Sequence, residues 1–157
     1  MRRCRRRDLM LRAMVRTVAV GTDGSGTADK AVEFAIDLAA RYGARIVFIS
    51  AYVPVSESRL RREREEAPDD LQWMVNPAED VDATLRDCEE RAEARGLRWV
   101  SEARQGDAAK VLTQLARSND ADLLVIGNKG MERKVLGSVP NSVSHNAPCS
   151  VVIVKTT

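Results

Sequence analysis

The sequence predicts a single α/β domain built on an open, parallel, five-stranded sheet. Five short apolar or β-branched runs alternate along the chain with four segments that carry apolar residues at helical spacing. Three of the runs, at 46–49, 123–126 and 151–154, are continuously apolar, and the first two are typical of strands that helices cover on both faces. A chain of 157 residues, 44% of them hydrophobic, can form one packed core without disulfides or metals.

The first strand and helix are separated by a clear turn. Thr17–Gly21 is a short β-branched run, and Thr22–Gly26 is a cluster of turn residues. The helix that follows has one apolar stripe, which consists of Ala28, Ala31, Val32, Ala35, Ile36 and Ala39. Gly43 stands where a C-terminal cap belongs, so we expect the helix to end there.

The second unit contains a charged segment. Arg45–Tyr52 predicts a buried strand, and residues 53–77 lack a sustained apolar face, which we interpret as a mobile loop or an exposed helical turn. A helical stripe then returns up to Gly96; its members are Val81, Leu85, Cys88 and Ala92. Leu97–Ala103 is a weaker, mixed strand that suits a sheet edge.

The third helix begins at a recognisable cap. Gly106 and Asp107 form a turn and an N-cap, and the helix is expected to end near Asn119. Its inward side consists of Ala108, Val111, Leu112, Leu115 and Ala116. Ala121–Ile126 predicts the next buried strand.

The last unit is short. Gly127–Leu136 is expected to form a loop, and Ser138–Asn146 a helix with Val139 and Val143 facing inward. Val151–Lys155 predicts the final strand.

Charge is distributed unevenly, although the net charge is only +2. Residues 1–13 contain six arginines and one aspartate and lack the apolar stretch of a signal peptide. We interpret them as a disordered tail or a start-site artefact, with a basic arm for nucleic acid or anionic lipid as the alternative. Residues 14–157 are expected to form the domain, which lacks a basic face with interleaved aromatics and so is not expected to bind nucleic acid.

Composition also bears on location and on metal sites. The apolar runs are far shorter than the ~20 residues that cross a bilayer, so no membrane partner is expected. Three cysteines without a CxxC pair suit a reducing cytoplasm better than secretion. The single histidine, His145, excludes a multi-histidine metal site.

Two glycine-rich loops are expected to meet at one edge of the sheet. One is Gly21–Gly26 after the first strand, and the other runs from Gly127 to Ser138 after the fourth. Ligands of open α/β sheets bind beyond the carboxyl ends of strands, where the winding direction reverses. Gly127 and Gly130 would let backbone N–H groups approach an anion, and Gly137-Ser138 opens a helix whose dipole favours phosphate. The second loop is therefore either a phosphate cradle or a plain connection.

Asp23, just past the first strand, has two open roles. It would either bind a ribose hydroxyl or a phosphate-bound metal, or cap the turn before the first helix. Neither GxxxxGK[ST] nor GxGxxG occurs in the loops, which excludes the P-loop and the dinucleotide fingerprint.

Several segments together resemble the universal stress protein family. They are VAVGTDGS at 18–25, ADLLVIG at 121–127, GNKG at 127–130, GSVPNSV at 137–143 and APCSVVIV at 147–154. The resemblance covers about Val15 to Lys155, and its most specific part is the GxxG followed by Gly-Ser, which marks the nucleotide-binding branch. It implies a Rossmann-like sheet of order 3-2-1-4-5 with helices on both faces. It also implies a homodimer paired near the last strand that binds ATP or another adenine nucleotide in stress regulation.

The resemblance further implies a nucleotide site. Gly21, Thr22 and Asp23 would face adenine and ribose, and Ala51 would wall the adenine pocket. The ribose and phosphates would be surrounded by Gly127, Asn128, Lys129, Gly130, Gly137, Ser138, Val139 and Pro140. No catalytic or metal-ligating residue is assigned, although Mg²⁺ would accompany ATP.

One departure from the family pattern lies in the phosphate loop. The family has nine residues between the second glycine and Gly-Ser, whereas Met131–Leu136 supply only six here. A shorter loop would tighten the site, favour a shorter phosphate such as that of cyclic AMP or AMP, or weaken binding. Because the glycines are retained, we expect binding to be retained.

The leading hypothesis is a cytoplasmic regulatory protein that binds ATP, AMP or cyclic AMP as a signal or structural ligand. A slow ATPase or self-modifying enzyme is one alternative, with Asp23 and Glu132 as the nearby carboxylates. A nucleotide-free dimeric adaptor is the other.

Overall fold

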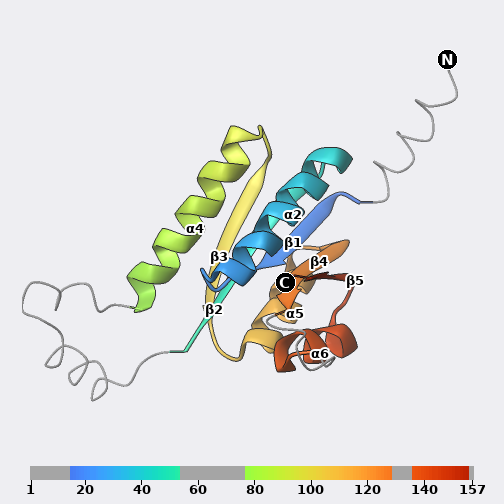
Figure 1. Ribbon diagram of the computed structural model, residues 1–157. Helices are drawn as coiled ribbons and strands as arrows, with labels where there is room; N and C mark the ends of the chain where they lie inside the picture. The colour runs from blue at the N-terminus through green and yellow to red at the C-terminus, as the bar shows by residue number, and fades with distance from the viewer. Residues whose placement is uncertain (1–14, 54–76, 129–135, 156–157) are drawn as a thin grey trace, which may run out of the picture.

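A computed structural model describes residues 15–53, 77–128 and 136–155 of the chain (Figure 1). The strands are β1 (Thr17–Gly21), β2 (Arg45–Tyr52), β3 (Trp99–Gln105), β4 (Leu123–Asn128) and β5 (Ser150–Lys155). The helices are α2 (Gly26–Tyr42), α4 (Pro77–Ala94), α5 (Ala108–Ser118) and α6 (Ser138–Asn146). Strands and helices alternate through the described residues, as the sequence predicts.

The described strands form one parallel sheet of order β3-β2-β1-β4-β5. β1 is central and pairs with β2 on one side and with β4 on the other. β3 and β5 are the two edges, which agrees with the mixed sequence of β3. The predicted fold class and strand order are therefore confirmed.

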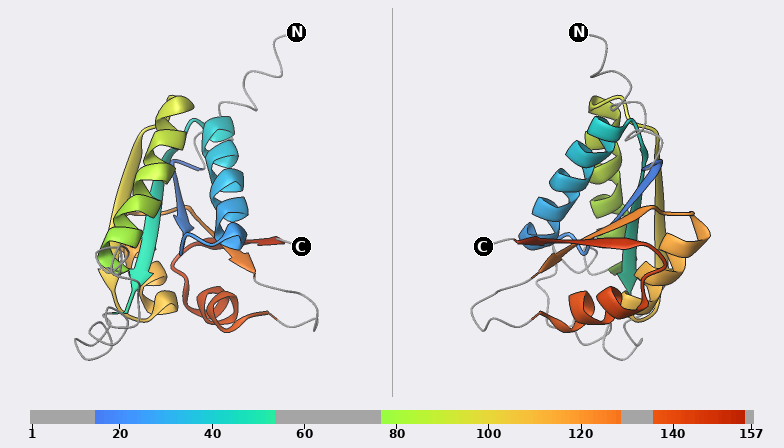
Figure 2. Two further views of the ribbon diagram at one scale, coloured as in Figure 1. Left: turned by 60° about the vertical axis from the view of Figure 1, so that its left-hand side comes forward. Right: turned by 90° about the vertical axis from the view of Figure 1, so that its right-hand side faces the viewer.

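Helices cover both faces of the sheet (Figure 2). α2 and α4 pack on one face, over a buried cluster that includes Val18 and Phe48. α5 and α6 pack on the other, over a cluster that includes Ala19 and Ile49. Neighbouring residues of β1 and β2 thus point to opposite cores, because side chains alternate along a strand. This double burial explains the continuous apolar runs of the central strands.

The helix boundaries follow from caps in the sequence. Ser25 is the N-cap of α2, and its Oγ accepts a hydrogen bond from the Ala28 N–H at 3.2 Å. Gly43 is the C-cap at φ +66°, a left-handed conformation that glycine adopts at little cost. Asp107 caps α5 and accepts from the Lys110 N–H at 3.1 Å, as predicted.

Two strands begin later than the sequence predicts. β3 starts at Trp99 rather than Leu97, because the Leu97 N–H closes the end of α4 by donating to the Ala92 carbonyl at 3.0 Å. β4 starts at Leu123 rather than Ala121. Just before it, the Asp122 carboxylate accepts the Thr17 N–H at 3.0 Å and so fixes the start of β1.

β4 also ends later than predicted. Gly127 and Asn128 were expected to begin a loop, but they continue the strand. They do so because they pair in register with Val154 and Lys155 of β5. The last two residues of β4 therefore lie at the rim of the sheet.

Three predictions fall wholly or partly on other residues. The basic tail, the charged segment after β2 and most of the loop after β4 lie outside the described ranges, and stay predictions. Within those ranges, no helix combines the length and the apolarity that a membrane span requires.

Candidate functional site

The carboxyl ends of β1 and β4 lie next to each other at the centre of the sheet. From β1 the chain goes on to β2 and β3 on one side, and from β4 to β5 on the other. The loops that leave two such strands diverge, and a crevice results between them. Both glycine-rich segments of the sequence start at this point.

A cavity of about 260 Å³ occupies this crevice. Its walls come from the turn after β1, the first turn of α2, the ends of β2 and β4, one side of α5 and the first turn of α6. The lining residues are Gly21, Thr22, Asp23, Ser25, Thr27, Ala28, Ile49, Ala51, Ala108, Leu112, Ile126, Gly127, Gly137, Ser138, Val139 and Pro140. Glycine and aliphatic residues dominate, with hydroxyls and one carboxylate among them. Such a mixture suits a ligand that has a flat apolar part and a polar end.

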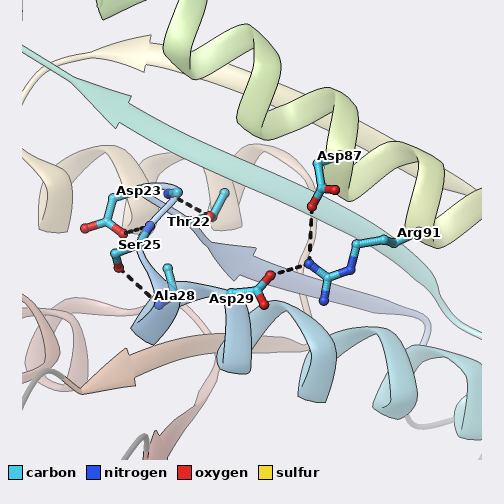
Figure 3. A network of polar contacts seen from close by, with 8 residues as sticks. Thr22, Asp23, Ser25, Ala28, Asp29, Asp87 and Arg91 are labelled. Carbon is cyan, nitrogen blue, oxygen red and sulfur yellow. Dashed lines mark hydrogen bonds and ion pairs between the residues drawn. The ribbon is translucent and has the colours of Figure 1, made fainter.

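The turn after β1 is held by its own hydrogen bonds (Figure 3). The Thr22 N–H donates to the carbonyl of Ile49 on β2 at 2.9 Å. The Thr22 Oγ1 accepts from the Gly24 N–H at 3.2 Å, and the Asp23 Oδ1 accepts from the Ser25 N–H at 3.0 Å. Asp23 therefore closes the turn, whereas the N-cap of α2 is Ser25. Its carboxylate is exposed and also lines the cavity, so a contact with a ligand stays compatible with this role.

Two glycines at the cavity leave room for neighbouring elements. A Cβ on Gly21 would lie 2.7 Å from Cδ2 of Leu112 on α5. A Cβ on Gly127 would lie 3.0 Å from the backbone oxygen of Thr27 on α2. A side chain at Gly127 would press on the backbone of α2, whereas one at Gly21 would displace the end of the Leu112 side chain. Gly127 therefore allows β4 and α2 to approach closely, and Gly21 leaves room for the Leu112 side chain at the cavity wall.

The start of α6 presents backbone N–H groups to the cavity. Gly137 is the N-cap, and the first bond within the helix runs from the Asn141 N–H to the Gly137 carbonyl at 3.0 Å. The Ser138 and Val139 N–H groups precede that bond and so have no acceptor within the helix. Pro140 has no N–H to offer. The helix dipole adds a partial positive charge at this end.

Most of the predicted site residues are brought together by the fold. Those that line the cavity are Gly21, Thr22, Asp23, Ala51, Gly127, Gly137, Ser138, Val139 and Pro140. Asn128 does not line it; its side chain is 2% exposed and lies behind the wall. Lys129 and Gly130 lie outside the described residues.

Several lining residues were not predicted. They come from α5, from the start of α2 and from the ends of β2 and β4. These residues are Ala108, Leu112, Ser25, Thr27, Ala28, Ile49 and Ile126. The Gly106-Asp107 turn places the start of α5 at the same rim as the other loops. This turn is the feature of the sequence from which a contribution of α5 to the site could be predicted. Ala108 and Leu112 stand four residues apart, which puts both on the same side of the helix.

A second hollow, of about 400 Å³, lies behind the turn after β1, between α2 and α4. Arg91 on α4 bridges this gap by pairing with Asp29 on α2 (Figure 3). It also pairs with Asp87 on its own helix at 3.4 Å. The neighbouring Cys88 lines the hollow and is 2% exposed. Burial raises the pKa of the Cys88 thiol to about 11, although the nearby Arg91 charge partly opposes the rise.

This raised pKa predicts a pH-dependent loss of stability. The folded thiol holds its proton up to about pH 11, whereas the unfolded thiol titrates near 9.0. Between these values the unfolded state binds fewer protons, so the free energy of unfolding falls as pH rises, by up to ~1.4 kcal/mol per unit. Urea unfolding of the protein and of Cys88→Ala between pH 8 and about 11 isolates this effect. Parallel pH curves for the two proteins would contradict it.

Comparison with known proteins gives a consistent result. The model of the Universal stress protein family matches residues 14–155. A universal stress protein of Mycobacterium tuberculosis (strain H37Rv) is 36% identical over 146 residues, which cover 90% of this chain and 97% of that protein. A universal stress protein of Thermus aquaticus is 33% identical over 149 residues, which cover 90% of this chain and all (100%) of that protein.

A solved structure is similar both in sequence and in fold. It is the crystal structure of a universal stress protein in complex with cAMP, at 33% identity and a TM-score of 0.68. The match covers 91% of this chain and 98% of the other.

Proposed function

Because the chain belongs to the universal stress protein family, we propose that its central cavity binds an adenine nucleotide. The carrying observation is that one cavity joins apolar walls to the first turn of α6. In the proposed pose, adenine lies against the apolar walls, ribose lies near the turn after β1, and the phosphate lies at the start of α6. The residues for this pose come from loops that are far apart in the sequence and converge at one rim.

The base and the ribose find complementary chemistry in the cavity. Ala51 on β2 and Leu112 on α5 offer aliphatic contact to the faces of a purine ring. Asp23 and Thr22 lie on the adjoining turn, where a carboxylate and backbone groups can bind ribose hydroxyls. The hydrogen bonds within this turn hold it in place before the ligand arrives, which lowers the ordering cost of binding.

Among the described residues, the donors at the phosphate end suit a single phosphoryl group. The Ser138 and Val139 N–H groups and the Ser138 hydroxyl are the donors that the first turn of α6 offers, since Pro140 has none and the Gly137 N–H is already engaged by Asn128. Two adjacent N–H groups match one phosphate. We therefore propose AMP or cyclic AMP as the preferred ligand over ATP with Mg²⁺. The relative crystallised with cAMP, 33% identical, supports this choice.

The proposed role of the nucleotide is that of a signal or structural ligand in stress regulation. Support comes from the family membership and from the lining, in which backbone N–H groups, hydroxyls and aliphatic side chains favour binding. The proposal includes a cytoplasmic homodimer paired along β5. This strand forms one edge of the sheet, and its apolar residues 151–154 are half-buried in the single chain.

Calorimetric titration of the full chain with adenosine, AMP, cyclic AMP and ATP with Mg²⁺ tests the function. We expect AMP and cyclic AMP to bind at least about tenfold more tightly than adenosine, because adenosine has no phosphate to place at the start of α6. Ala51→Phe places a ring in the cavity and is expected to weaken every adenine ligand. The matched control is Ala103→Phe, at an exposed position of β3.

Two outcomes would redirect the proposal. Absence of heat with every ligand, in folded and nucleotide-free protein, would contradict nucleotide binding and favour an adaptor. Sustained phosphate release from ATP that is lost in Asp23→Ala would contradict the signal role and favour a slow ATPase.

A further inference from the structure

Asn128 is a buried polar residue at the end of β4. Its side chain is 2% exposed, and it is the polar member of a set of large, fully buried side chains that are otherwise aliphatic or aromatic. A buried amide is costly unless it makes specific hydrogen bonds, so its contacts indicate its purpose. The strand places it at the rim of the sheet, in register with Lys155 of β5.

One side-chain hydrogen bond of Asn128 connects the end of β4 to the start of α6. Asn128 Oδ1 accepts a hydrogen bond from the Gly137 N–H at 3.2 Å. Gly137 is the N-cap of α6, and it makes no cap bond of its own because it has no side chain. The bond therefore ties the start of α6 to the end of β4 across a sequence separation of nine residues.

This bond holds the residue from which the helix begins. Ser138 and Val139 follow Gly137 directly, so their N–H groups turn with it if the N-cap moves. Resting on the proposed nucleotide binding, we propose that Asn128 is a positioning residue for the phosphate. It aims the first turn of α6 at the ligand without touching the ligand. The family resemblance placed Asn128 among the residues around the phosphates, and its burial behind the wall gives it this indirect role instead.

The ratio of AMP affinity to adenosine affinity tests the role. In Asn128→Leu, we expect this ratio to fall about tenfold, because only the phosphate depends on the aim of α6. A residue that merely supports the fold would weaken both ligands alike and leave the ratio unchanged. Asn146→Leu makes the same exchange at the exposed end of α6 and serves as the matched control.

A second variant cuts the same bond from the other side. Gly137 has φ −59°, which proline adopts, and Gly137→Pro replaces the amide hydrogen by a ring Cδ that excludes Asn128 Oδ1 from its place at 3.2 Å, so the bond is broken from the side of the donor. If both variants act through one bond, the ratio of AMP affinity to adenosine affinity falls no further in the double variant than in either single variant. Gly137→Pro retains the asparagine amide in the core, and therefore also tests the proposal if Asn128→Leu does not fold.

The outcomes separate this proposal from the proposed function. A wild-type chain that binds no adenine nucleotide overturns nucleotide binding itself. A wild-type chain that prefers AMP to adenosine, with the ratio unchanged in Asn128→Leu or with fully additive losses in the double variant, overturns the role of Asn128 alone.

Discussion

Replacing Ser138 by glutamate is expected to lower the affinity for AMP by about a hundredfold. Ser138 lines the cavity at the first position of α6, where the phosphate is proposed to lie. Two like charges about 4 Å apart at a protein surface repel by ~4 kcal/mol, and solvent at this exposed position reduces that figure. A loss of about 2.7 kcal/mol corresponds to a hundredfold change in affinity.

The same substitution is expected to preserve the fold. A carboxylate in the first turn of a helix interacts favourably with the dipole, so the midpoint of thermal unfolding should stay equal or rise slightly. Adenosine, which lacks the phosphate, should lose far less affinity than AMP. Calorimetry with both ligands measures the difference. Ser144→Glu, the same exchange at an exposed position further along α6, is the control.

Equal losses for AMP and adenosine in Ser138→Glu would contradict the phosphate position. So would an unchanged AMP affinity, because a phosphate at the start of α6 cannot be indifferent to a carboxylate there.

Phe48→Ala is expected to have the largest effect on stability. Phe48 lies on β2, is 0% exposed and packs in the core beneath α2 and α4. Removing a fully buried phenyl ring leaves a cavity and costs about 3–5 kcal/mol. Since the free energy of unfolding of such a domain is about 5–15 kcal/mol, this loss is a large fraction of its stability.

The chain offers a matched control for this prediction. Phe34 on α2 is 43% exposed, so Phe34→Ala removes the same ring from the surface and should cost about 1 kcal/mol or less. Urea unfolding without nucleotide gives both values with no contribution from ligand binding. Equal losses for the two variants would contradict the assignment of the core.

The fold could be predicted from the sequence because local and long-range signals agree. In α2, the N-terminal serine, the apolar stripe and the terminal glycine all point to the same helix, and all six stripe residues are buried. β1, β2 and β4 are buried on both faces, and this requires apolar residues in succession, which the sequence shows as continuous runs. The strand order was different: it came from the family resemblance, since alternation alone permits other orders.

The differences arise where tertiary contacts override local pattern. Gly127 and Asn128 look like loop residues, yet pairing with β5 keeps them in the strand. Ala121 and Asp122 look like strand residues, yet the Asp122 carboxylate is used to accept the Arg16 and Thr17 N–H groups at 2.7 and 3.0 Å. Neither effect is visible in a window of a few residues.

The candidate site could be predicted in part, for a similar reason. Glycine-rich loops mark the rim of the sheet, and the family resemblance named Gly21–Asp23 and Gly137–Pro140 there; all of them line the cavity. Leu112 of α5 reads as an ordinary core residue, and only the close approach to Gly21 shows that it is also a wall of the cavity. The role of Asn128 likewise depends on a contact nine residues along the chain.

The most direct test of the central claim is a crystal structure of the full chain grown with cyclic AMP. We expect the phosphate within hydrogen-bonding distance of the Ser138 and Val139 N–H groups, with adenine against Ala51 and ribose beside Asp23. A nucleotide bound elsewhere on the protein, or in this cavity with its phosphate turned away from α6, would contradict it.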